Sequence, residues 1–218
     1  MAETATGKRE AQKRKIEKTI IAAAENVFMK KGFRAATMDE IAEQASVTKR
    51  TLYKHFPSKL ALFVRMTDVY TAGLHREMAK VTSGEFEGKQ TIQDLYQAVF
   101  RFTRRHQKFM RLFWIVDSDE FEGEMPKDLI DQVKGPTSEA FKKYAELIAE
   151  ASQQGVVRPF DPMLLVHLLS AINKGIFMHA NKERQYEIAD IKPDDLFDLS
   201  MAILDGGLFV TPKKGRKS

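Results

Sequence analysis

The chain has 218 residues, 43% of them hydrophobic and none of them cysteine, and a formal net charge of +5. This apolar share is sufficient for a packed core, and the lack of cysteine excludes disulfides and thiolate metal sites. Apolar runs such as residues 163–172 are too short to cross a bilayer unaided, and residues 1–15 contain no hydrophobic signal-peptide segment. We therefore expect a cytoplasmic protein with no membrane partner.

The positive charge is concentrated at the N-terminus. Residues 1–66 carry 14 Lys and Arg against 7 Asp and Glu, whereas the remaining residues carry 21 against 23. A basic head on a near-neutral body favours a polyanionic partner for the head, the alternative being a solvated basic surface.

The first third of the chain predicts a charged arm followed by four helices. Apolar residues at helical spacing end at Gly32, and a capping box, Thr37 with Glu40, opens a short second helix. After a tight turn, Thr48 caps a third helix that continues to about His55. Pro57 ends that helix, and Ser58 caps a fourth from Lys59 to about Val81.

The rest of the chain predicts five further helices. A polar loop at 83–90 precedes a helix that we expect to begin at Thr91, and an aromatic-rich helix covers 108–117. After an acidic loop, a helix from about 127 is expected to break at Gly135–Pro136, to resume and to stop at Gly155.

Two apolar helices complete the pattern. Asp161 caps the first, with Pro162 at its first position, and the second covers about Pro193 to Leu208. Residues 211–218 are expected to be disordered. The predicted fold is all-α, with about nine helices and no internal repeat.

The second and third helices have the pattern of a helix-turn-helix. Ile41, Ala42, Ala45, Val47 and Leu52 can pack them together, which leaves the other face of the third helix basic. Lysine and arginine donate to guanine in the major groove, and hydroxyls and helix N-termini bind phosphate. The predicted DNA contacts are Thr37, Thr48, Lys49, Arg50, Thr51, Tyr53, Lys54, His55 and Lys59.

Residues 37–63, TMDEIAEQASVTKRTLYKHFPSKLALF, resemble the signature of TetR-type transcriptional regulators, and the resemblance covers about residues 12–65. The family's usual glycine at the turn is Ser46 here, which requires serine in a left-handed conformation. Arg50 stands where glycine is common, which favours a base contact that relatives lack.

The resemblance implies a homodimer that binds a palindromic DNA operator, usually represses nearby genes and is released by a small-molecule effector. It also implies the domain plan: a basic arm at 1–14, a helix-turn-helix domain at 15–60, an effector-binding and dimerisation domain at 61–210, and a tail at 211–218. Lys8, Arg9, Lys13 and Arg14 of the arm can reach phosphate or a minor groove, unless the arm is a frayed, solvated tail.

Residues 92–148 are rich in aromatic side chains, which together with a few polar groups can line a largely apolar ligand cavity. For any one of them, a place in the core is the simpler interpretation. Given the family resemblance, the pocket residues that we expect are His106, Phe109, Phe113, Trp114 and Tyr144.

The two last helices carry apolar faces that we expect to pair with their copies in a four-helix dimer interface, unless they complete the core of the monomer. Glycines inside such faces favour close approach of two backbones. The predicted interface residues are Leu164, Leu168, Ile172, Gly175, Ile176, Leu199, Ile203 and Gly206.

Other chemistry finds little support. Residues 84–90 resemble a phosphate-binding loop only in part, the histidines lack metal-ligand spacing, and no hydrolase, zincin or dinucleotide motif occurs. We expect neither an enzyme nor a cofactor nor a metal. The alternative function is a DNA-binding regulator without a small-molecule effector, whose C-terminal domain serves only for dimerisation or protein interaction.

Overall fold

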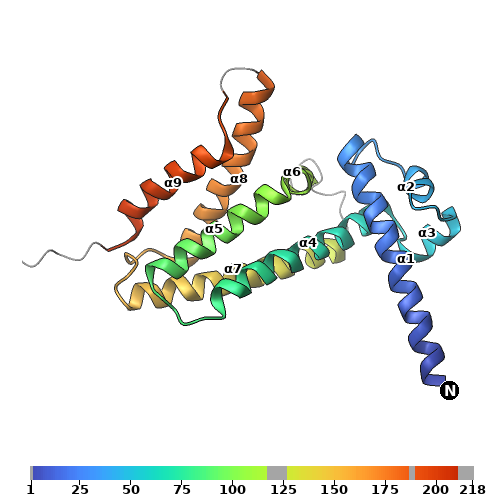
Figure 1. Ribbon diagram of the computed structural model, residues 1–218, viewed down its shortest axis with the longest axis horizontal. Helices are drawn as coiled ribbons and strands as arrows, with labels where there is room; N and C mark the ends of the chain where they lie inside the picture. The colour runs from blue at the N-terminus through green and yellow to red at the C-terminus, as the bar shows by residue number, and fades with distance from the viewer. Residues whose placement is uncertain (1, 117–126, 187–189, 211–218) are drawn as a thin grey trace, which may run out of the picture. The chain divides into compact units, whose positions relative to one another are not determined.

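The computed structural model describes residues 2–116, 127–186 and 190–210, which form nine α-helices (Figure 1). The helices are α1 (Ala2–Lys31), α2 (Met38–Gln44), α3 (Lys49–His55), α4 (Lys59–Thr82), α5 (Lys89–Arg105), α6 (Gln107–Val116), α7 (Lys127–Gln153), α8 (Pro162–Tyr186) and α9 (Pro193–Leu208). The predicted all-α fold is confirmed. The acidic loop and the C-terminal tail lie outside the described residues.

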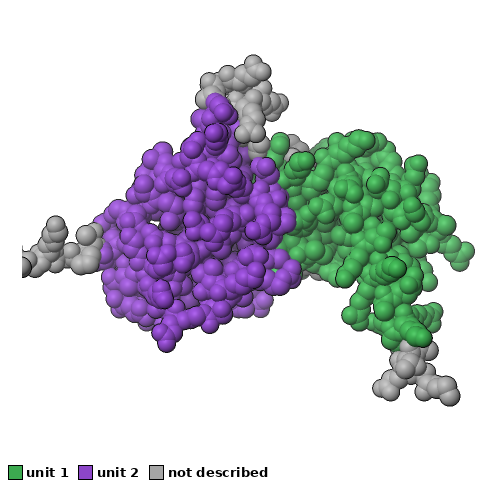
Figure 2. Space-filling model, in the orientation of Figure 1, with its two compact units in different colours: residues 1–72, 108–134 green, residues 73–107, 135–218 purple. Residues whose placement is uncertain are grey.

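The chain divides into two compact units, shown in different colours in Figure 2. Unit 1 comprises residues 1–72 and 108–134, and unit 2 comprises residues 73–107 and 135–218. The boundaries fall inside α4, after the first residue of α6 and inside α7. Unit 1 includes α6 because this helix contributes Phe109 and Leu112 to the core of the N-terminal helices. The division at 60–61 into a DNA-binding and an effector-binding domain stays a prediction.

The core of unit 1 is built around aromatic rings. Phe28 from α1, Phe33 from the α1–α2 connection and Phe63 from α4 lie with ring centroids 5.3 to 6.2 Å apart, and all three are buried. The ring of Phe109 lies with its centroid 6.4 Å from that of Phe63, and it stacks on Tyr70 at 3.7 Å. Offset and edge contacts of this kind add to the stabilisation from apolar burial.

The helix starts in unit 1 follow the predicted capping residues. Thr37 Oγ1 accepts a hydrogen bond from Glu40 N, and the Glu40 carboxylate accepts from Thr37 N, which completes the capping box. Thr48 Oγ1 caps α3 through Thr51 N at 3.1 Å, and Ser58 Oγ accepts from Ala61 N at 3.0 Å at the start of α4. Each such cap typically contributes about 1 kcal/mol.

In unit 2, α5 is buried along most of its length and packs against α8, which in turn packs against α9. The end of α9 is fixed to the α7–α8 loop by backbone hydrogen bonds, among them Arg158 N to Leu208 O at 2.9 Å. Asp205 of α9 accepts hydrogen bonds from Lys89 and Gln93 of α5, both at 2.6 Å. As predicted, Asp161 caps α8 through Leu164 N at 2.7 Å.

Two predicted boundaries in unit 2 are wrong. The helix expected from Thr91 begins at Lys89, because Gly88 with a φ of 59° makes the turn and Thr91 is buried, its hydroxyl accepting from Glu87 N. A Cβ at Gly88 would also lie 3.2 Å from Val156, so the close approach requires glycine. The second error concerns α7, which continues through Gly135–Pro136 without a break. A proline removes only one intrahelical hydrogen bond, and the long helix tolerates the loss.

Candidate nucleic-acid interface

The third helix is anchored to the rest of unit 1 by two apolar residues. Leu52 is fully buried, and Phe56, immediately after the helix, is 5% exposed. Ile41 and Ala42 of α2 are also buried and, with Val47 half-buried, belong to the same core, as the helix-turn-helix prediction requires. Since α3 has only seven residues, it depends on this packing and on its cap rather than on its own propensity.

The turn between α2 and α3 has the strained conformation that the sequence predicts. Ser46 has a φ of 54°, which is the one positive φ at a non-glycine residue among the residues that the structure describes. Its N–H donates to Glu43 O at 3.0 Å, and Val47 N donates to Ala42 O at 3.0 Å. A left-handed serine costs on the order of 1 kcal/mol, and these hydrogen bonds and the packing of Val47 hold it in place.

The outward face of α3 carries a compact set of long side chains. Lys49, Arg50, Tyr53 and Lys54 are all exposed, Tyr53 to 49%, and their spacing places them on one side of the helix, opposite Leu52. Thr51 lies beside them with its hydroxyl oxygen 2.9 Å from that of Thr48. This face presents three cations and one phenol to the outside on a helix that is fixed from behind.

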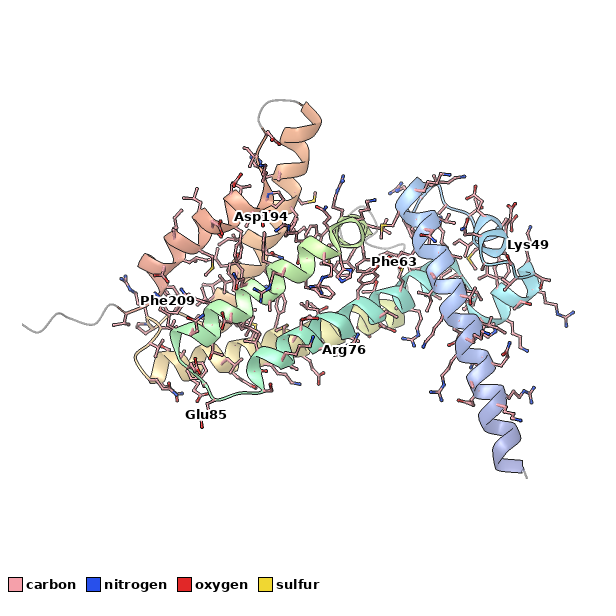
Figure 3. All side chains as sticks on the ribbon, viewed as in Figure 1. Lys49, Phe63, Arg76, Glu85, Asp194 and Phe209 are labelled. Atoms are coloured by element: carbon pink, nitrogen blue, oxygen red, sulfur yellow. The ribbon has the colours of Figure 1, made fainter. Side chains whose placement is uncertain are left out.

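One of these cations has an intramolecular partner. Lys49 Nζ lies 2.6 Å from Asp39 Oδ2 of α2, and this hydrogen bond raises the pKa of Lys49 (its position is labelled in Figure 3). Both side chains are more than half exposed, so the pair contributes little to stability. Its effect is to hold the Lys49 ammonium over the α2–α3 pair.

Two of the predicted contact residues are used inside unit 1. The His55 side chain is only 8% exposed, and its Nδ1 lies 3.3 Å from Glu17 Oε1 of α1. The Lys59 ammonium donates to the carbonyl oxygens of Arg34 at 3.1 Å and Ala36 at 2.8 Å and lies 4.8 Å from the centroid of the Phe33 ring. Burial lowers the pKa of Lys59. Both side chains stabilise contacts inside unit 1, so we do not include them in the DNA interface.

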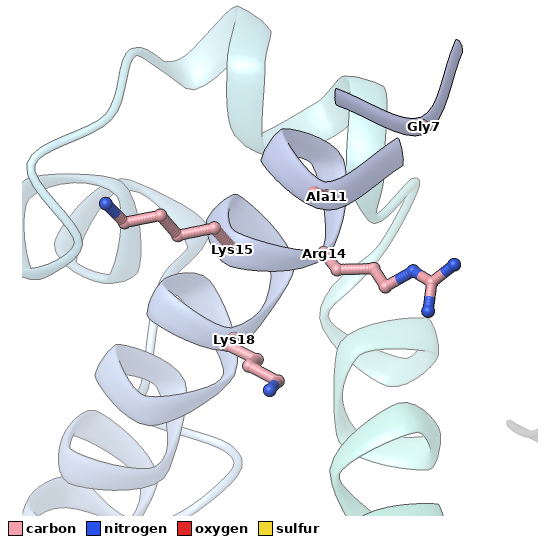
Figure 4. A pocket seen from close by; sticks show the side chains of 5 residues that line it. All are labelled: Gly7, Ala11, Arg14, Lys15 and Lys18. Carbon is pink, nitrogen blue, oxygen red and sulfur yellow. The ribbon is translucent and has the colours of Figure 1, made fainter. Parts of the chain in front are cut away.

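The basic arm is not separate from the first helix, because α1 is helical from Ala2. Lys8, Arg9, Lys13 and Arg14 are exposed on it, and Arg14 forms an exposed ion pair with Glu10 at 3.4 Å. A shallow hollow lies on the helix between the small residues and the cations of one face (Figure 4). Its lining residues are Gly7, Ala11, Arg14, Lys15 and Lys18. The arm thus presents its cations on a regular scaffold.

The residues predicted to line a ligand pocket are divided between the two units. Phe109, Phe113 and Trp114 belong to unit 1, where Phe109 is 2% exposed and part of the aromatic core. His106 and Tyr144 belong to unit 2, where the His106 ring lies 4.5 Å from that of Phe102. For Phe109, the simpler expectation of a core residue therefore holds.

Sequence reasoning missed a set of buried polar atoms that have no hydrogen-bond partner among the residues that the structure describes. These atoms are His75 Nε2, Tyr96 Oη, Tyr144 Oη and Asn173 Oδ1, and all four lie in unit 2. Leaving such a group unpaired typically costs about 1–3 kcal/mol. A partial signal was available, since Asn173 interrupts an otherwise apolar helix face.

The last two helices leave apolar side chains in solvent. Leu164, Leu168, Leu199 and Ile203 are 50–70% exposed, whereas Ile172 is half-buried and Ile176 is 6% exposed and part of the core. A Cβ added at Gly175 or Gly206 would meet nothing within 4 Å, so no close backbone approach occurs at these glycines among the described residues. The expectation that these helices merely complete the monomer core fails for the four exposed residues.

The apolar character of α8 extends further than the short run in the sequence indicates. Its segment Pro162–Ala180 has a mean hydropathy of 1.3 and is long and apolar enough, by length and composition only, to cross a membrane. However, 39% of the segment is buried within the protein, where it packs against α5 and α9. This pattern is typical of a core helix of a globular protein that also has an exposed apolar face, here with Leu164 and Leu168.

Comparison with known proteins agrees with this geometry. Residues 20–66 match the family model described as bacterial regulatory proteins, tetR family. The HTH-type transcriptional regulator RutR of Escherichia coli O157:H7 is 28% identical over 170 residues, which span 76% of each chain.

Solved structures extend the similarity to both units. A transcriptional regulator from Saccharomonospora viridis in complex with choline aligns with a TM-score of 0.74 and 14% identity over 91% of this chain and all of that one. AibR, solved in complex with isovaleryl coenzyme A and operator DNA, aligns with a TM-score of 0.68 and 16% identity over 86% and 97%. These two likenesses concern the fold alone.

Proposed function

Because this chain belongs to the TetR family of transcriptional regulators, which are not enzymes, we propose that it acts as a cytoplasmic dimeric repressor of a palindromic operator. A small, largely apolar or aromatic ligand bound in unit 2 releases it from DNA. The proposal depends on one observation: α3 is capped by Thr48 and anchored by the buried Leu52, while the cations on its other face are exposed. Two solved structures of this fold support the proposal, because one contains choline and the other contains both isovaleryl coenzyme A and operator DNA.

In the proposed complex, α3 enters the major groove with Lys49, Arg50, Thr51 and Lys54 toward base edges and Tyr53 toward phosphate. Thr48 and Thr37 lie at the helix starts nearest the backbone. Their hydroxyls already cap α3 and α2, so their role is to fix the two helices and to place them against phosphate. The arm cations of α1 add contacts that are independent of sequence.

The DNA contacts are tested by gel-shift titration with the DNA that flanks the gene. Tyr53→Ala and Lys54→Ala are each expected to weaken operator binding about 10-fold or more, since a base or phosphate contact contributes about 1–3 kcal/mol. Lys80→Ala, which removes an exposed lysine of α4 in unit 2, is the matched control. Unchanged binding by both α3 variants would refute the assignment of the recognition helix.

Arg50→Ala separates two kinds of contact at the position where the family commonly has glycine. If Arg50 reads a base, the variant loses discrimination between the operator and a sequence altered at that base pair, and its affinity for unrelated DNA changes little. If Arg50 binds phosphate, affinity for every sequence falls by a similar factor and the dependence on salt becomes weaker by about one unit of slope.

The proposed dimer is formed by the exposed apolar faces of α8 and α9 with their copies in a second chain. A face that includes Leu164, Leu168, Leu199 and Ile203 is unusual on an uncovered surface, and Gly175 and Gly206 leave room there for a second backbone. Leu168→Glu with Ile203→Glu is expected to give a folded monomer by analytical ultracentrifugation and to weaken operator binding. A wild-type monomer, or flotation of the wild-type chain with phospholipid vesicles, would contradict this proposal.

The alternative is a regulator with no small-molecule effector, in which unit 2 serves only for dimerisation or protein interaction. The unpaired polar atoms of unit 2 favour an effector over this alternative, because unpaired polar groups in a purely structural core lower stability without a gain in function. A thermal-shift screen with hydrophobic and aromatic compounds distinguishes the two. Stabilisation by a compound that also releases operator DNA supports the effector, and stabilisation by none supports the alternative.

A further inference from the structure

The buried polar atoms of unit 2 come from four different helices. His75 is on α4, Tyr96 on α5, Tyr144 on α7 and Asn173 on α8, and each presents one nitrogen or oxygen atom that is enclosed by protein without a hydrogen bond among the described residues. Tyr96, Tyr144 and Asn173 are 3–6% exposed. Buried polar groups in native proteins are nearly always paired, so a group of this kind marks a place where something else supplies the partner.

Two of the atoms are phenol oxygens, those of Tyr96 and Tyr144. Burial raises the pKa of both, that of Tyr96 to about 12. Ser200 lies near the Tyr96 hydroxyl, but it donates its own proton to Phe197 O at 2.7 Å, and the Tyr96 hydroxyl has no hydrogen-bond partner of good geometry among the described residues. Both phenols are neutral and retain a proton to donate. Together they suit an acceptor oxygen.

The Asn173 end has the opposite preference. Asn173 Nδ2 donates to Thr103 Oγ1 at 3.0 Å, and Thr103 in turn donates to Val99 O at 3.0 Å. One of the two N–H donors of the Asn173 amide is thus committed, which fixes the orientation of the side chain and leaves Oδ1 as an acceptor without a partner among the described residues. This end suits a hydroxyl or an N–H group.

His75 belongs near the same end. The turn of α4 that carries it lies along the last turns of α5, because a Cβ at Gly73 would lie 3.2 Å from the Phe102 ring and Glu77 lies 3.8 Å from Arg105. Its Nε2 can donate or accept according to the tautomer, so it adds a hydrogen bond of either kind.

The distance between the two ends follows from α5. Tyr96 and Thr103 are seven residues apart, which places them on the same face of the helix and separates them by about 10 Å along its axis. The buried side chains between and around them are mainly apolar, and no Asp, Glu, Lys or Arg is buried among the described residues. A charged ligand would find no counter-ion in this interior.

We propose that the interior of unit 2 binds an uncharged, elongated, mainly hydrocarbon molecule with a carbonyl or hydroxyl oxygen at one end and a hydroxyl or N–H group about 10 Å away. Tyr96 and Tyr144 donate to the oxygen, and Asn173 accepts from the other end. This inference deepens the proposed function, since it names the chemical class of the effector.

The test uses methyl 10-hydroxydecanoate, which has an ester carbonyl at one end and a hydroxyl at the other, with the full-length chain in calorimetric titration. Sodium 10-hydroxydecanoate replaces the ester by a charge, and methyl decanoate removes the hydroxyl. The ester alcohol is expected to bind at least about 10-fold more tightly than either analogue, because each lost hydrogen bond or unpaired buried group is worth about a factor of ten. No binding of the ester alcohol, or equal binding of the carboxylate, would overturn the proposal.

Single variants then locate the site. Tyr96→Phe, Tyr144→Phe and Asn173→Leu are each expected to weaken binding of the ester alcohol about 10-fold, whereas Tyr70→Phe, which removes a phenol paired with Glu25 in unit 1, leaves it unchanged. Without the probe, Tyr144→Phe is expected to melt no lower than the wild type, because its hydroxyl has no partner to lose. A clearly lower melting temperature, or unchanged binding in all three variants, would show that these groups are structural.

Operator binding without the probe separates this inference from the proposed function. All three variants are expected to bind operator DNA as the wild type does. Intact operator binding with no probe binding refutes the ligand class and leaves the DNA-binding proposal standing. Probe binding by a chain that binds no operator supports the ligand site and refutes the proposed function.

Discussion

The two units treat their polar groups differently. In unit 1 the polar side chains that lie against the core are paired: Tyr70 with Glu25, His55 with Glu17, and Lys59 with two backbone carbonyls. In unit 2, four buried polar atoms of the described chain have no partner, and large apolar side chains of α8 and α9 are exposed. Unit 1 thus pairs these polar groups internally and presents a fixed basic face, whereas unit 2 has unpaired polar atoms and exposed apolar side chains, which we propose that a ligand and a second chain cover.

The largest effect on stability is expected at Leu52, which anchors α3. It allows a comparison between a buried leucine of unit 1 and an exposed leucine of unit 2. Leu52→Ala is expected to lower the free energy of unfolding by about 2–5 kcal/mol, since Leu52 is fully buried. Leu164→Ala, at a residue 70% exposed, should leave the unfolding of the separated chains nearly unchanged. Urea denaturation followed by the fluorescence of Trp114, which lies in unit 1 and is the single tryptophan of the chain, measures the first change.

The next effect tests whether the pairing inside unit 1 contributes to stability. Lys59→Met keeps the length of the side chain but leaves the carbonyls of Arg34 and Ala36 without their donor, which should cost about 1–3 kcal/mol. Lys54→Met, at an exposed lysine of α3, should cost less than about 0.5 kcal/mol while weakening DNA binding. Equal destabilisation by the two variants in the same denaturation experiment would contradict the bracing role of Lys59.

A smaller effect is expected at the cap of α3. Thr48→Ala removes the acceptor for Thr51 N and should destabilise unit 1 by about 1 kcal/mol, whereas Thr48→Ser, which keeps the hydroxyl, should cost less. Operator affinity should fall with the alanine variant because the helix start frays. A stability of Thr48→Ala equal to that of the wild type would indicate that the cap is dispensable.

The smallest effect concerns the unpaired phenols and appears only in alkali. The pKa of Tyr96 is raised from an unfolded value near 10 to about 12, so its contribution to stability is present below pH 10 and is lost as pH rises from 10 toward 12. Tyr96→Phe should therefore lose less stability than the wild type between pH 9 and 11, by up to about 1 kcal/mol after allowance for partial solvation. Parallel pH dependence of the two melting temperatures would refute burial of this hydroxyl.

Local signals made the fold predictable. Thr37, Thr48, Ser58 and Asp161 act as caps through backbone groups three residues away. The left-handed Ser46 agrees with the resemblance, in which glycine is usual at this turn. The inward placement of Leu52, expected from the helix-turn-helix pattern, is confirmed.

Long-range contacts decided what the sequence could not predict. His55 contacts Glu17 of α1, and Lys59 contacts Arg34 and Ala36 of the α1–α2 connection. These residues are far apart in the sequence, so no local pattern encodes the contacts. The continuity of α7 through Pro136 depends on the whole length of the helix rather than on one residue. The unpaired atoms of unit 2 depend on four helices at once, so the aromatic richness of residues 92–148 indicated a pocket without identifying the polar atoms in it.

We propose that the exposed face of α3 in each of two paired chains contacts one half of a two-fold symmetric operator. Selection of bound sequences from a random DNA pool, with the wild type and Lys54→Ala in parallel, tests this proposal. We expect the wild type to enrich an inverted repeat with two half-sites about one helical turn or more apart, and Lys54→Ala to bind this repeat at least about 10-fold more weakly. Enrichment of no symmetric sequence, or equal binding by the variant, would contradict it.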